Sequence, residues 1–265
     1  MDSLASLPSE RQCHKQLYKI VRGKYVCPHC EGKILLRDRY VWCGRCRKKY
    51  SVRSETWFRG SKLSFQKIWL IIWCWQKKKG IGATKDISGV TYPTIRKWFR
   101  RLRKTLPKMY GSKLSGFVEV DESFFGKRKY GRQTIVVGAI ERGSRKLRLK
   151  IIRDRNRRTL ERFTVAHVAP GSNVRTDYHE GYNELFLYGY RHKRCNHSIG
   201  HFGSTNNIEN MWGVIKRHLR SLYCNLSITD LKYILIEWEN RQNNPDLFYT
   251  VGDYLRARAC SGYFH

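Results

Sequence analysis

The sequence predicts an α/β fold built around a mixed sheet, and three observations support this class. Short apolar runs that are typical of strands fall at residues 116–121, 134–141, 146–153 and 172–177. Apolar residues recur with helical spacing in four further segments, at about residues 157–167, 178–187, 205–221 and 228–242. The 265-residue chain is 41% hydrophobic and 13% aromatic, which is ample for a packed core.

The order of these elements narrows the fold class. Three antiparallel-looking strands, a helix, a further strand and more helices follow one another in an RNase-H-like order, which we assign to residues 114–245. Residues 1–58 carry two cysteine pairs, residues 61–108 have helical patterns, and residues 246–265 form a C-terminal extension. We therefore expect an RNase-H-like mixed-sheet domain preceded by two smaller domains.

The cysteine pairs have the spacing of a zinc ribbon. Cys27 and Cys30 form one C-x2-C pair, and Cys43 and Cys46 form a second pair after twelve intervening residues. A two-residue gap lets both thiolates of a pair face one ion, and two pairs supply the four ligands of a closed structural Zn²⁺ site. Disulfides or free core thiols are the alternatives, and a disulfide framework is not expected in a reducing compartment.

Residues 61–108 show the arrangement of a helix-turn-helix domain. A short helix pattern ends at a turn at Gly89, and a basic helix follows from about Pro93 to Leu106. Its apolar face holds Ile95, Phe99 and Leu102, and its basic face holds Arg96, Lys97, Arg100, Arg103 and Lys104. We predict that Arg96, Lys97 and Arg100 contact DNA; the alternative is a three-helix bundle with a solvated charged face.

The charge of the chain favours a polyanion as partner. Lys and Arg number 53 against 21 Asp and Glu, a formal net charge of +32. This excess favours double-stranded DNA or another nucleic acid over a solubility charge or an anionic membrane surface. The apolar run at residues 68–75 is far shorter than the ~20 residues of a membrane span, and the N-terminus lacks a signal-peptide pattern. We expect a cytoplasmic, nucleoid-associated protein, or a nuclear one in a eukaryotic host.

Three acidic residues stand out against this basic background. Asp121 and Asp177 each end a strand pattern, and Glu209 lies near the start of a helix pattern. Clustered carboxylates are the ligands that Mg²⁺ or Mn²⁺ prefers, and two such ions can support phosphodiester cleavage. Each acid taken alone could equally stabilise a turn or a helix start. The three together predict a divalent-metal site.

Neighbouring residues extend this prediction. Lys216 lies seven residues after Glu209, on the same helix face as Trp212, where it could contact a DNA phosphate. A plain surface lysine is the alternative. Glu119 and Glu122 flank Asp121, and we expect both to point away from the site.

The chain resembles DDE transposases of the Merlin superfamily and their zinc-ribbon-bearing bacterial insertion-sequence relatives. The stretches that carry this resemblance are VEVDESFFGKRKYGR, VAPGSNVRTDYHEGYNEL, GYRHKRCNHS and STNNIENMWGVIKRHLR, together with the N-terminal CPHC and CGRC pairs. The resemblance implies an RNase-H-like fold and a catalytic set of Asp121, Asp177, Glu209 and Lys216. Asn206 is the alternative third metal-site residue.

The resemblance also implies an activity. Enzymes of this kind bind the terminal repeats of a mobile element, cleave DNA at its ends and transfer a 3′ hydroxyl into target DNA. The resemblance also implies a divalent metal and a homo-oligomer that assembles on paired ends. A catalytically inactive DNA-binding regulator and an RNase-H-like nuclease without strand transfer are the alternatives.

Overall fold

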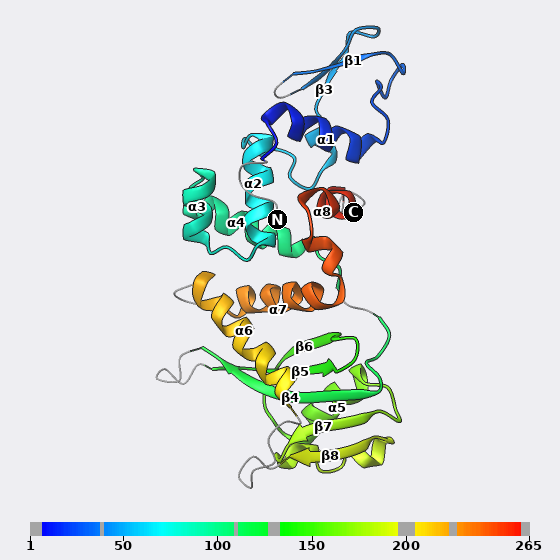
Figure 1. Ribbon diagram of the computed structural model, residues 1–265, viewed down its shortest axis with the longest axis vertical. Coiled ribbons are helices and arrows are strands. Elements are labelled where there is room, and N and C mark those ends of the chain that lie inside the picture. The colour runs from blue at the N-terminus through cyan, green and yellow to red at the C-terminus, as the bar shows by residue number, and fades with distance from the viewer. Residues whose placement is uncertain are drawn as a thin grey trace. The chain divides into compact units, whose positions relative to one another are not determined.

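The computed structural model describes residues 7–37, 40–108, 111–126, 133–195, 205–222 and 227–260. The chain divides into two compact units (Figure 1), one made of Met1–Leu106 with Asp246–His265 and the other of Pro107–Pro245. Throughout the described ranges, every helix is too short or too polar to cross a bilayer.

The first unit begins with a helix that the sequence pattern did not predict. Helix α1 (Glu10–Arg22) starts at a capping box, in which Ser9 and Gln12 satisfy each other's backbone N–H groups. It buries a mixed face that includes Leu17 and Tyr18. A small antiparallel sheet follows, made of β1 (Ile34–Leu36), β2 (Val41–Cys43) and β3 (Lys49–Tyr50). A 3₁₀ turn, η2 (Val52–Glu55), completes this region.

Three helices that pack on one another follow in the same unit. They are α2 (Phe65–Gln76), α3 (Ile81–Ser88) and α4 (Tyr92–Lys104). Gly89 ends α3 in the left-handed conformation, with a φ of 60°, as the predicted turn requires. The chain returns to this unit at its end with η7 (Pro245–Phe248) and α8 (Val251–Arg258), and α8 packs on α1 and α2.

The second unit contains a five-stranded mixed sheet. Its strands are β4 (Phe117–Phe125), β5 (Thr134–Glu141), β6 (Leu147–Ile152), β7 (Asn173–Asp177) and β8 (Arg191–Cys195). They lie in the order β6-β5-β4-β7-β8, with β4, β5 and β6 antiparallel and β7 and β8 parallel to β4. The helices are α5 (Arg157–His167), α6 (Asn206–Leu222) and α7 (Ile228–Asn243). This topology confirms the RNase-H-like fold class.

The region between β7 and β8 differs from the sequence prediction. The helix expected at residues 178–187 is replaced by two short 3₁₀ turns, η4 (Glu180–Tyr182) and η5 (Leu185–Tyr188). His179 accepts a hydrogen bond from the N–H of Gly181, and Gly189 ends the second turn in the left-handed conformation, so no continuous helix forms. Strand β8 was not predicted because its basic sequence lacks the apolar alternation of a half-buried strand.

The two faces of the central sheet are covered by different helices. Val118, Val120 and Val174 belong to a buried core with Leu160 and Phe163 of α5. Glu119 and Asp121 point to the opposite face, where α6 packs on β4 and β5. The candidate site lies on this second face.

Candidate functional site

Asp121 and Asp177 come together on neighbouring central strands. The parallel pairing of β4 with β7 runs through Glu119 and Arg175. Two residues further on, Asp121 follows on β4 and Asp177 on β7, so the two carboxylates leave the same face of the sheet in adjacent strands. Asp177 ends β7, as the sequence predicted, whereas Asp121 lies in the middle of β4, which continues to Phe125 instead of ending at residue 121.

The surroundings of Asp121 disfavour its charged form. Burial, the charge of Glu122 and the charge of Asp177 together raise the pKa of Asp121 to about 7, with burial as the largest cause. The indole Nε1 of Trp212 donates a hydrogen bond of 3.0 Å to Oδ2 of Asp121, which acts in the opposite direction. Two aspartates that crowd each other in this way form a site whose negative charge a cation would neutralise.

Helix α6 runs alongside β4, and its successive turns contact successive residues of that strand. At its start, Glu119 accepts hydrogen bonds from the backbone N–H groups of Asn207 and Ile208, at 2.8 and 3.1 Å. Trp212 then reaches Asp121, and the Lys216 amine lies 5.5 Å from the ring centre of Phe125. Burial lowers the pKa of Lys216, whereas the charge of Asp121 raises it. Lys216 is thus within the electrostatic reach of Asp121.

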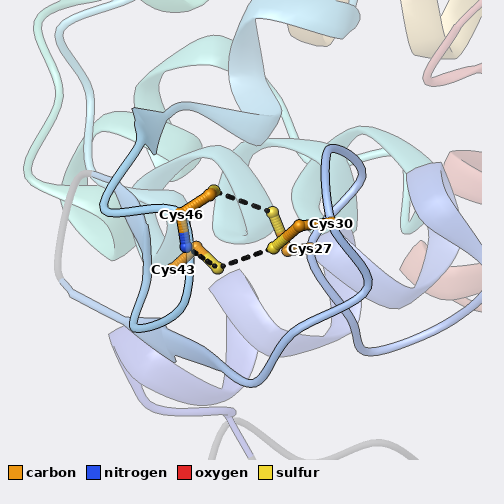
Figure 2. Close-up of side chains that lie close together, drawn as sticks. All are labelled: Cys27, Cys30, Cys43 and Cys46. Carbon is orange, nitrogen blue, oxygen red and sulfur yellow. Dashed lines mark hydrogen bonds between the residues drawn. The ribbon is translucent and has the colours of Figure 1, made fainter.

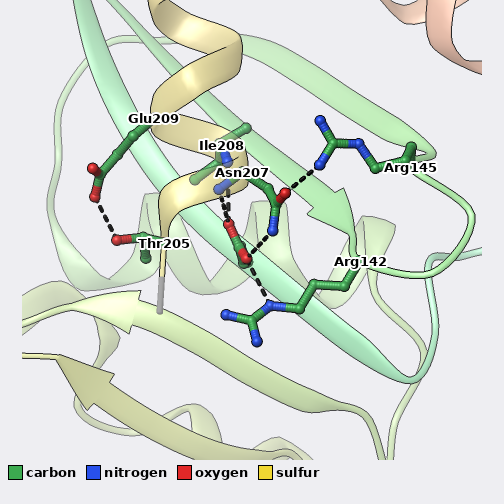
Figure 3. A network of polar contacts seen from close by, with 7 residues as sticks. Arg142, Arg145, Thr205, Asn207, Ile208 and Glu209 are labelled. Carbon is green, nitrogen blue, oxygen red and sulfur yellow. Dashed lines mark hydrogen bonds and ion pairs between the residues drawn. The ribbon is translucent and has the colours of Figure 1, made fainter. Parts of the chain in front are cut away.

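The expected orientation of Glu119 was wrong. Side chains alternate along a strand, so Glu119, two residues before Asp121, lies on the same face as Asp121. The fully buried Glu119 also pairs with Arg142, whose Nε lies 2.7 Å from Oε1. Figure 3 shows this network at the start of α6, including Asn207. The signal that could have revealed this role is an acid two residues before Asp121 in an apolar strand.

Glu122 does point to the opposite face. Its carboxylate accepts a hydrogen bond of 2.6 Å from the Tyr182 hydroxyl and forms an ion pair of 2.8 Å with Arg155. Burial raises the pKa of Glu122, and so does the charge of Asp177. Glu122 therefore adds to the negative potential at Asp121 without lying on the same face.

Glu209 occupies the first turn of α6 and is exposed. Its Oε1 accepts a hydrogen bond of 2.5 Å from the Thr205 hydroxyl (Figure 3). Asn206, the alternative third residue, is the exposed first residue of α6. Within the described residues, Asp121, Asp177 and Glu209 do not form a group whose ligand atoms all lie within 4.8 Å of one another. Glu209, Trp212 and Lys216 share one face of the helix by their spacing.

Gly138 makes room for Trp212 and was missed in the sequence. It pairs with Asp121 across β4 and β5. A Cβ atom at this position would lie 2.7 Å from the Trp212 ring and 2.9 Å from Leu149. A glycine inside an apolar strand is the signal that could have found this close approach.

The four predicted zinc ligands come together in the first unit (Figure 2). The sulfur atoms are 3.4 Å apart for Cys30 and Cys43, and 3.7 Å apart for Cys27 and Cys46. Four thiolates in a tetrahedron around one Zn²⁺ would lie about 3.8 Å apart. The N–H of Cys46 helps to lower the pKa of the Cys43 thiol to about 6. The cluster is consistent with a zinc ribbon.

The predicted DNA-contacting residues of α4 also lie together. Arg96, Lys97 and Arg100, with Pro93, line one shallow hollow on α4. Arg103 was expected on the same basic face, and that expectation was wrong. It is 1% exposed, and its guanidinium lies 5.7 Å from the ring centre of Phe99. The helical spacing carries Arg103 to the edge of the apolar face, where its stem packs in the core.

The strand order and the paired aspartates on β4 and β7 define an RNase-H-like domain with an acidic site. Residues 113–243 match the family model described as the ISXO2-like transposase domain. This match identifies residues 113–243 as a transposase domain of that family.

Two solved structures are similar to part of the chain. The catalytic core domain of BIV integrase is 12% identical, with a TM-score of 0.37 over 49% of this chain and 84% of that chain. The HTLV-2 integrase catalytic core domain, in a dimeric form in complex with magnesium, is 16% identical, with a TM-score of 0.36 over 51% and 90%. Likeness at this level carries no conclusion about this chain. None of the curated proteins matches it.

Proposed function

We propose that this protein is a DDE-type transposase that cleaves DNA at the ends of a mobile element and joins the freed 3′ ends to target DNA. The observation that carries this proposal is the position of Asp121 and Asp177 on the same face of adjacent central strands inside a matched transposase domain. In this proposal Glu209 is the third acid, and Lys216 is the cation that follows it on α6.

The acidic site suits Mg²⁺ or Mn²⁺. Its donors are carboxylate oxygens, and burial, together with the charges of Glu122 and Asp177, raises the pKa of Asp121 to about 7. Asp121 and Asp177 would hold the metal, and Glu209 would join them by exchanging its hydrogen bond with Thr205. Such ions, when bound, activate the attacking oxygen and stabilise the charge that develops on the leaving oxygen.

The protein's own residues then orient the reactants. Trp212 fixes the direction of the Asp121 carboxylate, and Lys216 can hold a phosphate beside it. In the first step, water attacks the phosphorus at the element's end, and the bond to the 3′ oxygen breaks to leave a 3′ hydroxyl. In the second step, that hydroxyl attacks a target phosphodiester, which forms the new joint and releases a target 3′ hydroxyl.

The first unit would bind the element's ends. Arg96, Lys97 and Arg100, which line one hollow on α4, would contact the DNA groove, and a structural Zn²⁺ held by the four cysteines would fix the ribbon. Joining two ends requires a homo-oligomer on paired DNA. Its place of work would be the nucleoid, or the nucleus in a eukaryotic host.

The test combines Mg²⁺, a labelled duplex of the element's end and a supercoiled target. The wild type is compared with Asp177→Ala and with Asp246→Ala, a matched change at an exposed aspartate that belongs to the first unit. We expect joined products from the wild type and Asp246→Ala, and none from Asp177→Ala. Cleavage without joining would favour a nuclease, and end binding without cleavage by any protein would favour a regulator.

A further inference from the structure

The sheet face that carries Asp121 changes from apolar residues on one side to basic residues on the other. In one row across the sheet, Leu147 and Ile140 lie beside Glu119, and beyond Glu119 come Arg175 on β7 and Lys193 on β8. Leu147 and Ile140 are fully buried, whereas Lys193 is exposed. The apolar half of this row lies under helices, whereas in the basic half Arg175 is half-buried and Lys193 is exposed.

The packing of the helices follows the same division. Helix α6 packs on β4 and β5, and α7 packs on β6. In Figure 1, α6 crosses the sheet over β4 and β5, and β7 and β8 continue the sheet beyond it. Among the described elements, the main contacts of β7 are with β4 and β8.

The side chains of β8 divide between the two faces. His192 and Arg194 point to the far face, where His192 bonds the Thr176 hydroxyl at 3.0 Å and Arg194 stacks 4.5 Å from the ring centre of Tyr178. Arg191 and Lys193 alternate with them, and both are exposed on the face of Asp177. The side chains on the far face of β8 are thus held by contacts within the protein, whereas those on the face of Asp177 present cations to solvent.

These cations lack the acidic partners that four arginines of the same unit have. Within the described residues, no ion pair joins Arg175, Arg191 or Lys193 to a carboxylate. Other arginines of this unit are paired, namely Arg142 with Glu119, Arg155 with Glu122, Arg157 with Glu184 and Arg241 with Glu237. Cations that the fold leaves without an acidic partner are available to an external anion.

We propose that Arg175, Arg191 and Lys193 form a basic strip that binds the phosphodiester backbone of duplex DNA beside Asp121 and Asp177. Arg175 lies two residues before Asp177 on the same face, about 6.6 Å along the strand, so it would hold a phosphate close to the reacting one. Arg191 and Lys193 continue the strip to the outer edge of the sheet. The proposal rests on the proposed function, because the strip directs DNA to the same acidic site.

Charged residues on an edge strand also protect it from pairing with another chain. That role needs no ligand, and it would be served by charges on either face of β8. A phosphate-binding role requires the exposed charges to face the carboxylates, as they do here. The two roles are distinguished by the salt dependence of DNA binding, since protection of an edge makes no phosphate contact.

The test measures binding of the full-length protein to a labelled duplex of unrelated sequence, without metal, over a range of salt concentrations. The double variant Arg191→Gln with Lys193→Gln is compared with Arg158→Gln plus Arg162→Gln. The control pair is exposed on α5, which covers the opposite face, and it removes the same charge. Circular dichroism would verify that both proteins remain folded.

We expect the strip variant to lower the log–log salt slope by about 2, roughly one unit for each phosphate contact, and to weaken binding at least tenfold at low salt. The control pair should keep the wild-type slope. Equal slopes for the wild type and the strip variant would overturn the proposal. This readout needs no cleavage, so a wild type that binds DNA through the strip but never cleaves it would contradict only the proposed transposase activity.

A second measurement places the DNA directly. A photo-crosslinking amino acid at position 193 should capture the duplex, and the same group at position 162 should not. Crosslinking from position 162 alone would show that DNA binds the α5 face and would overturn the strip.

Discussion

The indole Nε1 of Trp212 lies 3.0 Å from Oδ2 of Asp121 and donates a hydrogen bond to it, which ties α6 to β4 at the candidate site. The ring is 4% exposed and meets Phe125 edge-on, with ring centres 5.9 Å apart. The same helix carries Glu209 and Lys216. One contact therefore sets both the direction of an aspartate and the position of the helix that brings the other site residues.

Replacing Trp212 by Phe removes the donor and keeps most of the packing. A hydrogen bond to a charged group contributes about 1.5–3 kcal/mol, so the DNA cleavage rate should fall roughly ten- to a hundredfold. Cleavage rate and affinity for the element's end are measured in parallel. End binding should stay at the wild-type level, because α4 belongs to the other unit. An unchanged cleavage rate would show that Asp121 needs no such donor.

Gly138→Ala tests the same contact from the other side. The added Cβ would lie 2.7 Å from the Trp212 ring, so the indole must move away from Asp121. Overpacking of this kind costs about 1–3 kcal/mol. We expect a lower thermal midpoint and a cleavage defect similar to that of Trp212→Phe. The matched control is Gly143→Ala, because a Cβ at that glycine meets nothing within 4 Å. A wild-type cleavage rate in Gly138→Ala would contradict the inference that close packing of Trp212 on Gly138 positions the indole for Asp121.

Glu119 anchors the start of α6, and its loss should loosen the helix. Its carboxylate accepts bonds from the N–H groups of Asn207 and Ile208 and pairs with Arg142. Glu119→Ala leaves these groups without their buried acceptor, at a cost of about 3 kcal/mol in the free energy of unfolding. Urea denaturation measures this loss, with the exposed Glu180→Ala as the control. Equal midpoints for the two variants would mean that α6 docks without Glu119.

The four-cysteine cluster predicts a metal-dependent first unit. Zinc binding couples to folding in small metal domains, so a chelator should remove about one Zn²⁺ per chain and lower the thermal midpoint. Cys43→Ser should abolish tight zinc binding. Cys260→Ser, at a half-buried thiol outside the cluster, should leave it intact. Full zinc content in Cys43→Ser, measured by atomic absorption, would exclude the proposed ligand set.

Much of this fold could be predicted because its central strands and helices carry strong patterns. The strand bearing Asp121 has apolar residues at alternate positions, and the helix bearing Glu209 and Lys216 has a clear apolar face. The cysteine spacing likewise specifies its own geometry. Periodicity locates an element whenever burial determines which residues it contains.

The remaining features depend on contacts between distant residues. Strand β8 is an edge strand with a basic sequence, so its pairing with β7 leaves no apolar signature. Glu119 is buried because α6, some ninety residues later, supplies the N–H groups that it accepts. The seat of Trp212 requires both Gly138 and the packing of α6 across the sheet. None of these partners is a neighbour in the sequence.

The raised pKa of Asp121 predicts that the metal-free protein loses stability as the pH rises. Burial and the charges of Glu122 and Asp177 bring the native pKa to about 7, above the ordinary value of 3.8. Between these two values the native carboxyl binds a proton that the unfolded one has lost. The stabilisation is therefore complete below about pH 4 and disappears as the pH passes 7, with an upper limit of roughly 4 kcal/mol.

Asp121→Asn should remove this dependence, because its side chain does not titrate. Thermal midpoints without metal are measured from pH 5 to 8, and the wild type should fall relative to the variant over this range. Mg²⁺ should reverse the trend for the wild type alone, since cation binding needs the ionised carboxylate and so raises the midpoint more at pH 8 than at pH 5.5. Parallel curves for the two proteins would mean that Asp121 is already ionised in the native state, so that burial and the neighbouring charges do not raise its pKa.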